Sequence, residues 1–402
     1  MKRRALILIG GTRTNGPLYV QAARNLGLNP ITMADDPRRH DYHAAEDNEV
    51  ICVDTSNLDA LICECARLFA AYDIAGITSS EEAAYATVGR LCRHFNLPGP
   101  NADSVERCCD KFTQRQLLAQ ADIPIPAYGL ATNAYEVVSS AAEIGFPVIV
   151  KPATDTGGSE GVRLCASRDE LIQHTAYILS RWNTRQSSPK ILVEEFVKGS
   201  HYWVEMMGDD VIGIASLEFG PSPHFVYNTC AYPAVLTNEQ DERISDVSLR
   251  CLQALDLHWG PTNVELRWTE QGPVVIEVNP RMSGSPGVEL VELACGINLI
   301  REHIKLVIGD EGDLRGSRSD SAAAQFLVPE RDGVLDWIEG VSRAAAIPGV
   351  AKVKLYLQPN TTIKRRGDHR DLIGYVTASS PDLARTEAIL QRAVDLIEWS
   401  VA

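Results

Sequence analysis

The stretch VELRWTEQGPVVIEVNPR, residues 264–281, has the pattern of two short strands joined by a turn at Glu270–Gly272. With the hairpin centred near Gln271, Glu265 lies directly across from Glu277. Because side chains alternate between the two faces of a strand, the face with the carboxylates also carries Arg267, Asn279 and, as a further candidate, Arg281. The sequence therefore predicts a hairpin that sets two carboxylates against each other.

Two like charges across a strand pair destabilise it by up to about 1 kcal/mol unless a positive group lies between them. One candidate is the guanidinium of Arg267 or Arg281. The other is a bound cation, since Mg²⁺ prefers oxygens from one or two carboxylates, waters and phosphates. Glu265, Glu277 and the amide oxygen of Asn279 supply such ligands. The hairpin alone supports ion pairing and metal binding equally.

Length and charge limit the kinds of protein and partner. A chain of 402 residues is expected to form two or three domains. The net charge of −15 disfavours nucleic acid and anionic membranes as partners, so phosphate binding would need a local site. The ten cysteines form no C-x-x-C pair, which indicates neither a zinc site nor a disulfide framework. No apolar run is long enough for a membrane span, and we expect a cytoplasmic protein.

The order of strand and helix patterns predicts three parts. Residues 1–105 alternate strands and helices, as in a small parallel α/β sheet of Rossmann-like type. The glycine turn GGTRTNG, residues 10–16, does not match G-x-G-x-x-G, so nicotinamide or flavin binding is not favoured. Residues 106–192 and 193–402 have an α+β pattern with an antiparallel sheet, and a closing helix is expected over Leu383–Trp399.

A second feature is an apolar strand that ends in Lys151 and enters the loop TDTGGSEG, residues 154–161. Three glycines with hydroxyl side chains suit a cover over phosphates, because glycine lets backbone N–H groups approach oxygens closely. The loop is not a Walker A motif, since no Gly-Lys-Ser/Thr follows the required spacing. Taken alone, such a stretch is more often an ordinary turn.

A third feature is ILVEEFVKGSH, residues 191–201, an apolar strand that ends in two carboxylates and reaches His201 after a glycine. A solvated strand end with a structural histidine is one interpretation. The other is a nucleotide clamp, in which backbone groups of the segment meet adenine and a polar side chain meets ribose.

Together these features resemble the ATP-grasp superfamily, in its biotin carboxylase-like branch. The resemblance covers nearly the whole chain and rests on the order of Lys111, the Lys151 strand with its glycine-rich loop, the EEFV segment and the series E-x11-E-x-N-x-R. It implies a two-lobed ATP-grasp fold behind the Rossmann-like domain, with domains 1–105, 106–192 and 193–402.

The resemblance also implies ligands and their residues. ATP would lie between two α+β lobes, and one or two Mg²⁺ ions, with Mn²⁺ as an alternative, would join its phosphates to the hairpin. The implied ATP-binding residues are Lys111, Lys151, Gly157, Gly158, Ser159, Gly161, Glu194, Glu195, Phe196, Val197 and His201, the last at the ribose. The implied metal ligands are Glu265, Glu277 and Asn279.

Arg281 is the expected catalytic cation. Such enzymes phosphorylate a carboxylate and let an amine displace the phosphate, and a guanidinium fits carboxylate and phosphate oxygens. The loop at Ser283, Gly284 and Ser285 precedes a helix, whose first amides would receive a substrate carboxylate; a helix start without ligand is the equal alternative. Further candidate substrate residues are Arg267, His224 and Tyr232.

Within the superfamily the chain looks most like the L-amino-acid ligases of bacilysin and dapdiamide type. The expected partners are therefore a small carboxylate and an amino acid, and the expected product is an amide, with release of ADP and phosphate. Purine-pathway ligases and biotin carboxylase-like enzymes are alternatives within the superfamily. A nucleotide-binding regulatory module is the alternative of another class. A homodimer is expected only because it is the commonest oligomer.

Overall fold

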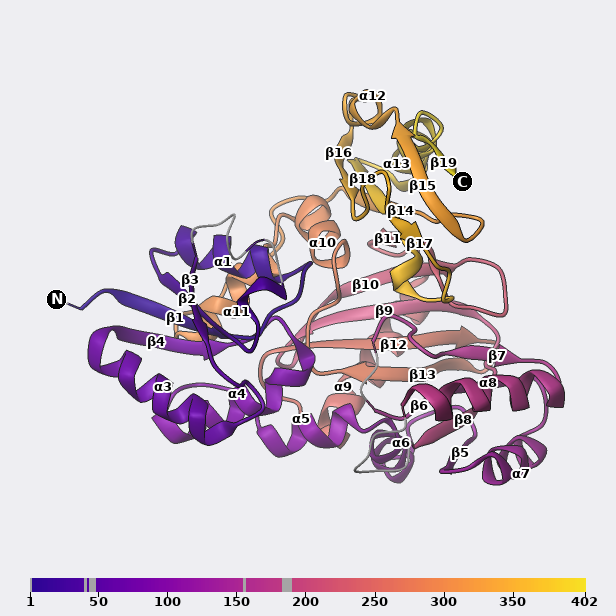
Figure 1. Ribbon diagram of the computed structural model, residues 1–402, viewed down its shortest axis with the longest axis horizontal. Coiled ribbons are helices and arrows are strands. Elements are labelled where there is room, and N and C mark those ends of the chain that lie inside the picture. Colours follow the sequence, from indigo (N-terminus) through magenta and orange to yellow (C-terminus); the bar gives the residue numbers. More distant parts are fainter. Residues whose placement is uncertain (1, 40–41, 43–47, 155–156, 183–189) are drawn as a thin grey trace.

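The computed structural model of the protein describes residues 2–39, 42, 48–154, 157–182 and 190–402 (Figure 1). Asp155 and Thr156 of the glycine-rich loop lie outside the described residues. The described strands form four sheets. Among the described helices, none has both the length and the apolarity needed to cross a membrane.

The N-terminal domain (residues 2–109) is a parallel sheet with strand order β3-β2-β1-β4. Its elements are β1 (Arg4–Ile9), α1 (Gly16–Asn25), β2 (Asn29–Ala34), β3 (Glu49–Cys52), α3 (Leu58–Ala71), β4 (Asp73–Thr78), α4 (Glu82–Phe95) and α5 (Ala102–Cys109). The side chains of β1 alternate: Ile7 joins a core with α3 and α4, whereas Leu6 and Leu8 join a core on the other face of the sheet. The predicted Rossmann-like α/β domain is confirmed.

The small lobe (residues 111–195) carries an antiparallel sheet with strand order β5-β8-β6-β7. Its elements are α6 (Lys111–Gln120), β5 (Tyr128–Ala131), α7 (Ala134–Ile144), β6 (Val148–Pro152), β7 (Arg163–Cys165), α8 (Arg168–Arg181) and β8 (Ile191–Glu195). Helices α7 and α8 close a core on this sheet that contains Val150, Leu171 and Val193. The boundary expected after residue 192 falls inside β8, because that strand pairs with β5 and β6 to its end.

The large lobe (residues 200–307) and the C-terminal segment (residues 321–401) share one eight-stranded sheet with the order β13-β12-β9-β10-β11-β14-β18-β16. The large lobe contributes β9 (Ser200–Met207), β10 (Asp210–Phe219), β11 (Tyr227–Tyr232), α9 (Asn238–Leu255), β12 (Pro261–Thr269), β13 (Gly272–Asn279), α10 (Gly287–Cys295) and α11 (Leu299–Val307). The C-terminal segment contributes β14 (Ser321–Leu327), β16 (Val350–Leu355) and β18 (Gly374–Ser380). The predicted antiparallel α+β architecture is confirmed.

The remaining C-terminal elements are β15 (Gly333–Glu339), α12 (Val341–Ala345), β17 (Thr362–Ile363), α13 (Leu383–Val394) and β19 (Glu398–Val401). The predicted closing helix through Trp399 is wrong at its end: α13 stops at Val394, and Trp399 lies in β19, opposite Ile338 of β15. The pairing of β19 with a strand about sixty residues earlier is not visible in local periodicity.

The hairpin of β12 and β13 places Glu265 opposite Glu277, as predicted. Thr269 pairs with Gly272, so the turn is one residue shorter than a hairpin centred on Gln271 would be. A bulge at Ile276 restores the register, because Leu266 pairs with Val275 and Glu265 with Glu277. The two carboxylates therefore face each other because of the bulge.

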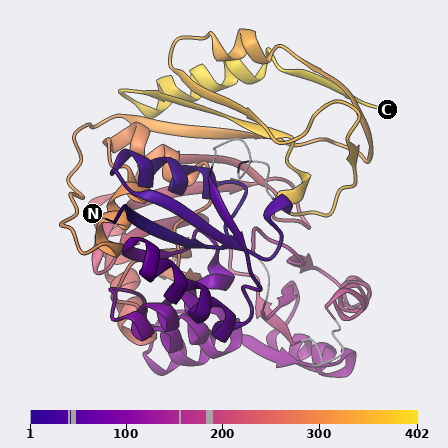
Figure 2. The same ribbon diagram turned by 60° about the vertical axis from the view of Figure 1, so that its left-hand side comes forward.

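Helix α11 packs against α1 and β4 of the N-terminal domain, although it follows the large lobe in the sequence. The same core contains Leu6 of β1, Ile304 of α11 and Tyr375 of β18, and it thereby joins the N-terminal domain, the large lobe and the C-terminal segment. The sheet of the small lobe packs with α7 and α8 in a core of its own, whereas Leu118 of α6 joins a core with β9, α9 and β12 of the large lobe. Figure 2 shows α7 and α8 at the lower right, away from the N-terminal sheet.

Candidate active site

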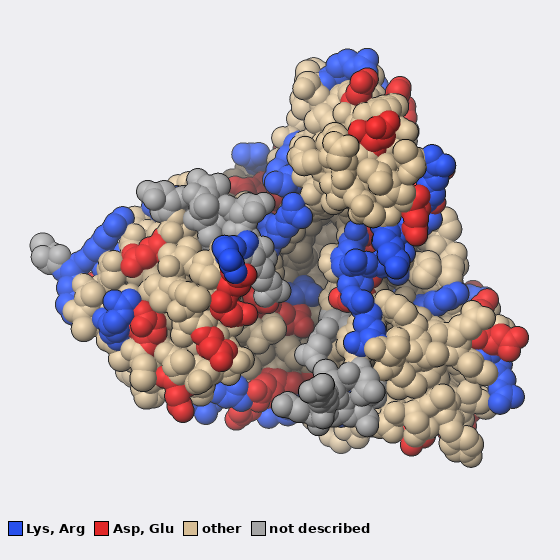
Figure 3. All heavy atoms as spheres, in the orientation of Figure 1, with Lys and Arg blue, Asp and Glu red and all other residues tan. Residues whose placement is uncertain are grey.

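A cavity of about 640 Å³ is lined by residues of all four parts of the chain. Figure 3 shows a hollow near the centre of this face, with Lys and Arg side chains gathered at its border. Among the described lining residues, basic side chains slightly outnumber acidic ones: Arg13, Lys111, Lys151, Arg267, Arg281 and Arg370 against Glu160, Glu194, Glu195, Glu265 and Glu277. An acidic protein thus has a locally basic cavity, as binding of phosphates requires.

Lys111, at the start of α6, and Lys151, in β6, are buried and line the cavity. Lys111 Nζ lies 3.0 Å from Glu277 Oε1, and Lys151 Nζ lies 2.6 Å from Glu194 Oε2. The other oxygen of Glu194 accepts from Arg115 Nε at 2.6 Å. Because a buried ammonium needs a charged partner, these pairs fix both lysines at the cavity wall.

Glu277 is held in its ionised form. Burial raises the pKa of its carboxyl group, but the attraction of Lys111 and Lys151 outweighs burial and brings the pKa to about 2. Burial lowers the pKa of Lys111, yet Glu277 and Glu82 raise it above its usual value on balance. A carboxylate and an ammonium therefore coexist here at neutral pH.

Glu265 has a different partner, since its Oε2 lies 3.3 Å from His201 Nε2. His201 packs edge-on against Phe219, and neither of its ring nitrogens makes a hydrogen bond with another described residue. The structure thus brings the predicted ribose residue into the cavity, beside a predicted metal ligand.

The two candidate arginines make their closest contacts elsewhere. Arg267 Nη1 donates to the Gly199 carbonyl at 3.0 Å, and its guanidinium lies over the Phe196 ring, 5.4 Å from the centroid. Arg281 Nε pairs with Glu82 of the N-terminal domain at 2.7 Å. Burial lowers the pKa of Arg281, but Glu82, Glu265 and Glu277 raise it above its usual value, so this arginine still attracts the facing carboxylates. Lys111 is the cation in direct contact with Glu277.

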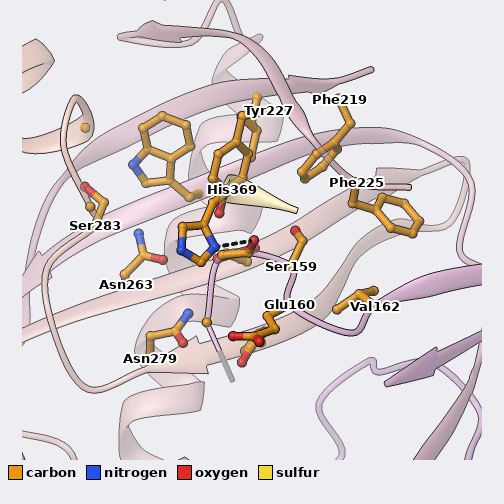
Figure 4. A pocket seen from close by; sticks show the side chains of 18 of the residues that line it. Ser159, Glu160, Val162, Phe219, Phe225, Tyr227, Asn263, Asn279, Ser283 and His369 are labelled. Atoms are coloured by element: carbon orange, nitrogen blue, oxygen red, sulfur yellow. Dashed lines mark hydrogen bonds between the residues drawn. The ribbon is translucent and has the colours of Figure 1, made fainter. Parts of the chain in front are cut away.

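The glycine-rich loop reaches the C-terminal segment. The backbone N–H of His369 donates to the Gly158 carbonyl at 3.0 Å, and Arg370 Nη1 pairs with Glu160 Oε1 at 2.5 Å. Gly158 has a φ of +59°, and a Cβ there would lie 2.5 Å from His369 Nδ1, so only glycine fits this contact. Figure 4 shows His369 above Ser159 and Glu160.

The segment 194–197 forms an apolar wall of the cavity. Phe196 and Val197 line it together with Ile149, and the ring of Phe225 lies 6.5 Å from that of Phe196. Glu194 does not offer its carboxylate to a ligand, because Arg115 and Lys151 occupy both oxygens. The wall suits a planar aromatic ring such as adenine, whereas the role of Glu194 is to position Lys151.

Two backbone amides after Arg281 donate hydrogen bonds within the protein. The Ser283 N–H donates to Glu205 Oε1 at 3.2 Å, and the Gly287 N–H donates to the Gly284 carbonyl at 2.8 Å. These two amides are therefore engaged within the protein, and a substrate carboxylate at this loop would have to use other groups; its binding here stays a prediction. Burial raises the pKa of Glu205 to about 7, against the hydrogen bond from Ser283.

The hydroxyl of Ser285 is likewise engaged by another side chain. Its hydroxyl donates to Glu289 Oε1 at 2.6 Å, and Lys352 Nζ lies 3.0 Å from the same oxygen. The C-terminal segment thereby fixes the start of α10. Ser283, Gly284 and Ser285 all line the cavity, as expected of substrate-contacting residues.

Two predicted substrate residues lie outside the described cavity lining. Tyr232 is buried and donates its hydroxyl to the Ile212 carbonyl at 2.9 Å. His224 packs against Gly367. The cavity wall instead receives Tyr227 and Phe225 from the same stretch of sequence.

Sequence reasoning missed Arg115, Glu205 and Asn263. Arg115 follows Lys111 by four residues in α6, a spacing that puts both on one helix face. Glu205 shares a face of β9 with His201 and Trp203 by alternation. The helix spacing of Arg115 and the strand alternation of Glu205 can be read from the sequence, but neither indicates which residues these side chains contact.

The residues present fit a Mg²⁺-bound nucleoside triphosphate. Glu265, Glu277 and Asn279 offer oxygens on one hairpin face, next to two buried lysines. In the described part of the chain, no three His, Cys, Asp or Glu residues gather as a metal site. A cation here would therefore need oxygens from a ligand, as Mg²⁺ does when it is bound with phosphates.

Comparisons with known proteins agree with this geometry. The family model described as "Carbamoyl-phosphate synthase L chain, ATP binding domain" matches residues 110–314, just over half of the chain. The model described as "ATP-grasp N-terminal domain" matches residues 20–99. The chain belongs to the ATP-grasp family. As an ATP-grasp enzyme of the carboxylate-amine type, it is an ATP-dependent ligase. A third model, "L-amino acid ligase C-terminal domain 2", matches residues 325–402.

ATP-grasp relatives match along the full chain. "Uncharacterized protein y4rH" of Sinorhizobium fredii is 56% identical over 400 residues, which are 100% of this chain and 84% of that protein. The structure of L-amino acid ligase from Bacillus licheniformis has a TM-score of 0.81 at 19% identity, and covers 100% of both chains. The biotin carboxylase domain of Hydrogenobacter thermophilus 2-oxoglutarate carboxylase, solved with MgADP and bicarbonate, has a TM-score of 0.72 at 17% identity over 100% of this chain and 91% of that one. At these identities the two structures show the fold alone.

Proposed function

We propose that this ATP-grasp enzyme activates a small carboxylate as an acyl phosphate and joins it to the amine of an amino acid. The products are an amide, ADP and phosphate. The observation that carries the proposal is the hairpin of β12 and β13, where Glu277 pairs with Lys111 and faces Glu265 inside the cavity that Arg281 also lines.

The residues suit both steps of such a reaction. In the first, a carboxylate oxygen attacks the γ-phosphorus, the bond to the β,γ-bridging oxygen breaks, and ADP leaves. Lys111 and Lys151 stand where they neutralise the phosphates, and Mg²⁺, when bound by Glu265, Glu277 and Asn279, neutralises the remaining phosphate charge. The hairpin thus serves the transfer rather than the fold.

In the second step the amine attacks the acyl carbon, the C–N bond forms, and the C–O bond to phosphate breaks as the amine loses a proton. Negative charge develops on the carbonyl oxygen. Arg281 lies beside Asn279, its Nη2 3.4 Å from Asn279 Oδ1, and is the cation we assign to that oxygen.

The amino-acid subtype has separate support. The match of residues 325–402 to the L-amino acid ligase model covers the part that closes over the cavity through His369 and Arg370. The full-length fold likeness to the Bacillus licheniformis ligase agrees with it. MgADP in the Hydrogenobacter thermophilus structure supports Mg²⁺ as the metal.

The test is ADP release by the purified protein with Mg-ATP and pairs of amino acids, with product masses measured by mass spectrometry. If one carboxylate substrate is labelled with ¹⁸O, one labelled oxygen should appear in inorganic phosphate, because the C–O bond breaks in the second step. Label that stays wholly in the amide and residual acid would contradict an acyl phosphate.

Two control reactions separate the alternatives. Bicarbonate in place of organic carboxylates tests for a biotin carboxylase-like or purine-pathway activity. Tight binding of Mg-ATP with no ADP formation from any pair would instead favour a regulatory module.

A further inference from the structure

The guanidinium of Arg281 has partners within the protein at each of its three nitrogens. Its Nε pairs with Glu82 at 2.7 Å, its Nη1 donates to the Met282 carbonyl at 3.1 Å, and its Nη2 donates to Asn279 Oδ1 at 3.4 Å. A guanidinium carries five N–H donors, so these contacts take up a large part of its donor capacity. The positive charge remains available to the acyl oxygen of the second step, and there is room for a further donor from another residue.

Tyr227 offers a hydroxyl to the same cavity. It begins β11, pairs with Phe219 of β10, is partly buried and lines the cavity. Its hydroxyl makes no hydrogen bond with another described residue, and it is not closed off from the cavity as the unpartnered atoms of Trp203 and Asn279 are. Figure 4 shows Tyr227 among the side chains that line the pocket. A donor that the fold leaves unused thus faces the space in which the substrates bind.

The ring of Tyr227 is held on two sides. Its centroid lies 5.8 Å from that of Phe219 and 5.6 Å from that of Phe326, which comes from β14 of the C-terminal segment. Both separations fall in the range of about 4.5 to 7 Å at which aromatic pairs stabilise each other. Neither neighbour has a polar side-chain atom that would compete for the hydroxyl. A donor fixed in this way needs no reorganisation when charge develops on a nearby oxygen.

The charges that act on Tyr227 are those of the reaction centre. Burial raises the pKa of its hydroxyl, Glu265 and Glu277 raise it further, and Arg281 lowers it. These interactions reach across the cavity, because Glu265 and Glu277 lie on the hairpin of β12 and β13 whereas Tyr227 lies on β11. A phenol in this place keeps its proton at neutral pH, so it donates a hydrogen bond and does not serve as a base.

We propose that Tyr227 is a catalytic residue of the second step, in which its hydroxyl donates a hydrogen bond to the acyl oxygen that becomes negatively charged as the amine attacks. This assignment rests on the proposed function. The attack forms the C–N bond and moves an electron pair of the C=O bond onto the oxygen, which Tyr227 and Arg281 hold between them. When the pair returns, the C–O bond to phosphate breaks, and the proton lost by nitrogen leaves with the phosphate as HPO₄²⁻. Tyr227 keeps its own proton throughout.

The test follows both products of a single turnover in Tyr227→Phe, which keeps the ring and removes only the hydroxyl. With the protein in excess over ATP, quenched samples are assayed for ADP and for amide, using the substrate pair with the highest wild-type rate. ADP formation should stay within about threefold of wild type, because the first step places no new charge on the acyl oxygen. Conversion of the acyl phosphate to amide should slow by about 100-fold, as expected for the loss of one oxyanion donor. Amide should therefore appear well after ADP.

Tyr135→Phe is the matched control, since it makes the same change at an exposed tyrosine of α7 in the small lobe. It should leave both rates at the wild-type value. The Tyr227 hydroxyl has no partner among the described residues, so its removal leaves no buried group unpaired. The thermal melt of Tyr227→Phe should therefore coincide with that of the wild type, whereas a structural role would lower the melting temperature.

Two results would overturn the assignment. One is amide that follows ADP as closely in Tyr227→Phe as in the wild type. The other is ADP formation that slows as much as amide formation, which would place the hydroxyl at the phosphates. In both cases the wild type still forms an amide, so these results are distinct from failure of the proposed function, in which no substrate pair yields one.

Discussion

Single charged side chains position the reactive groups of this cavity. Glu194 shows how: it is 2% exposed, and its two oxygens hold Arg115 and Lys151 at 2.6 Å each. Arg115 in turn donates to the carbonyl of Ile276, the bulge residue that sets the register of the hairpin. One buried carboxylate thus links Lys151, a lysine of the cavity wall, to the position of Glu277.

Replacement of Glu277 by glutamine should lower the rate of ADP formation by about 100-fold or more. The change removes one negative charge from the Lys111 pair and from the metal ligands while it keeps the shape of the side chain. Steady-state assays of ADP release measure it. Glu270→Gln in the exposed turn of the same hairpin is the control, and equal rates for the two variants would remove the metal assignment.

Arg281→Ala should cost about 3 kcal/mol of transition-state stabilisation, close to the cost of losing one oxyanion donor elsewhere. The ratio of kcat/KM between wild type and variant gives this energy. Glu82→Gln removes the ion-pair partner of Arg281 and a weaker charge interaction with Lys111, while it keeps both cations, and should cost much less. A larger loss in Glu82→Gln than in Arg281→Ala would assign the arginine to domain contact alone.

Glu205 should make stability depend on pH. Its pKa is raised by burial to about 7, so between the unfolded value near 4.5 and pH 7 the folded state binds the extra proton. The free energy of unfolding therefore falls as pH rises through this window, by up to about 3 kcal/mol, and levels off above it.

Denaturant unfolding of the wild type and Glu205→Gln at pH 5, 6, 7 and 8 measures this dependence. As pH rises from 5 to 7, the free energy of unfolding of the wild type should fall relative to that of Glu205→Gln. Glu270→Gln, which removes an exposed carboxyl group, should follow the wild type. Parallel curves for wild type and Glu205→Gln would show that the buried carboxyl group titrates as in the unfolded chain.

At the scale of elements, the cavity depends on contacts between segments far apart in the sequence. The loop 157–161 meets residues 369 and 370 of the C-terminal segment, and Arg370 also pairs with Asp368 at 2.5 Å. Among the described residues, His369 contacts the Gly158 carbonyl through its main chain and its ring, and Glu160 pairs with Arg370 and more distantly with Arg181. If the loop closes over phosphates as proposed, the contacts with the C-terminal segment should affect how easily it opens.

Arg370→Ala should raise KM for ATP about fivefold, with a smaller change in kcat, because a half-buried ion pair contributes about 1 kcal/mol to the closed loop. Lys364→Ala, an exposed charge of the same segment, is the control. In the double variant Arg370→Ala/Glu160→Gln, KM for ATP should be little higher than in Arg370→Ala alone. A fully additive double variant would show that Arg370 acts on ATP by another route.

Local sequence patterns predicted which segments form helices and strands better than they predicted which segments contact one another. Alternation predicted that Glu265 faces Glu277, and the structure agrees, but the shorter turn and the compensating bulge at Ile276 that set this register were not predicted. The contacts of Lys111 and His201 with these carboxylates could not be predicted, since the two residues reach the hairpin through α6 and β9. The end of α13 was missed for the same reason, as β15 draws Glu398–Val401 into a strand. Tyr232 was misplaced because alternation puts it on the same face of β11 as Cys230 but does not say how far along the strand the cavity extends.

At the scale of the whole molecule, three of the four parts share a core. Leu6, Ile304 and Tyr375 belong to one cluster that joins the N-terminal domain, the large lobe and the C-terminal segment. The eight-stranded sheet continues without interruption from β13 to β16. These parts form one body around the hairpin. The sheet of the small lobe, by contrast, packs with α7 and α8 in a core of its own, and only α6 of that lobe shares a core with the large lobe.

Because the sheet of the small lobe has a core of its own, the backbone amides should fall into two groups with different rates of hydrogen exchange. Strands β5, β6 and β8 should exchange through a sub-global opening that leaves the eight-stranded sheet protected, so their deuterium uptake should precede that of β9 and β12. Mass spectrometry of peptic fragments resolves the two groups. Addition of Mg²⁺ with a non-hydrolysable ATP analogue should slow the first group most, because nucleotide bridges Lys151 to the hairpin. Uptake at one common rate would mean that all four parts unfold as a single cooperative unit.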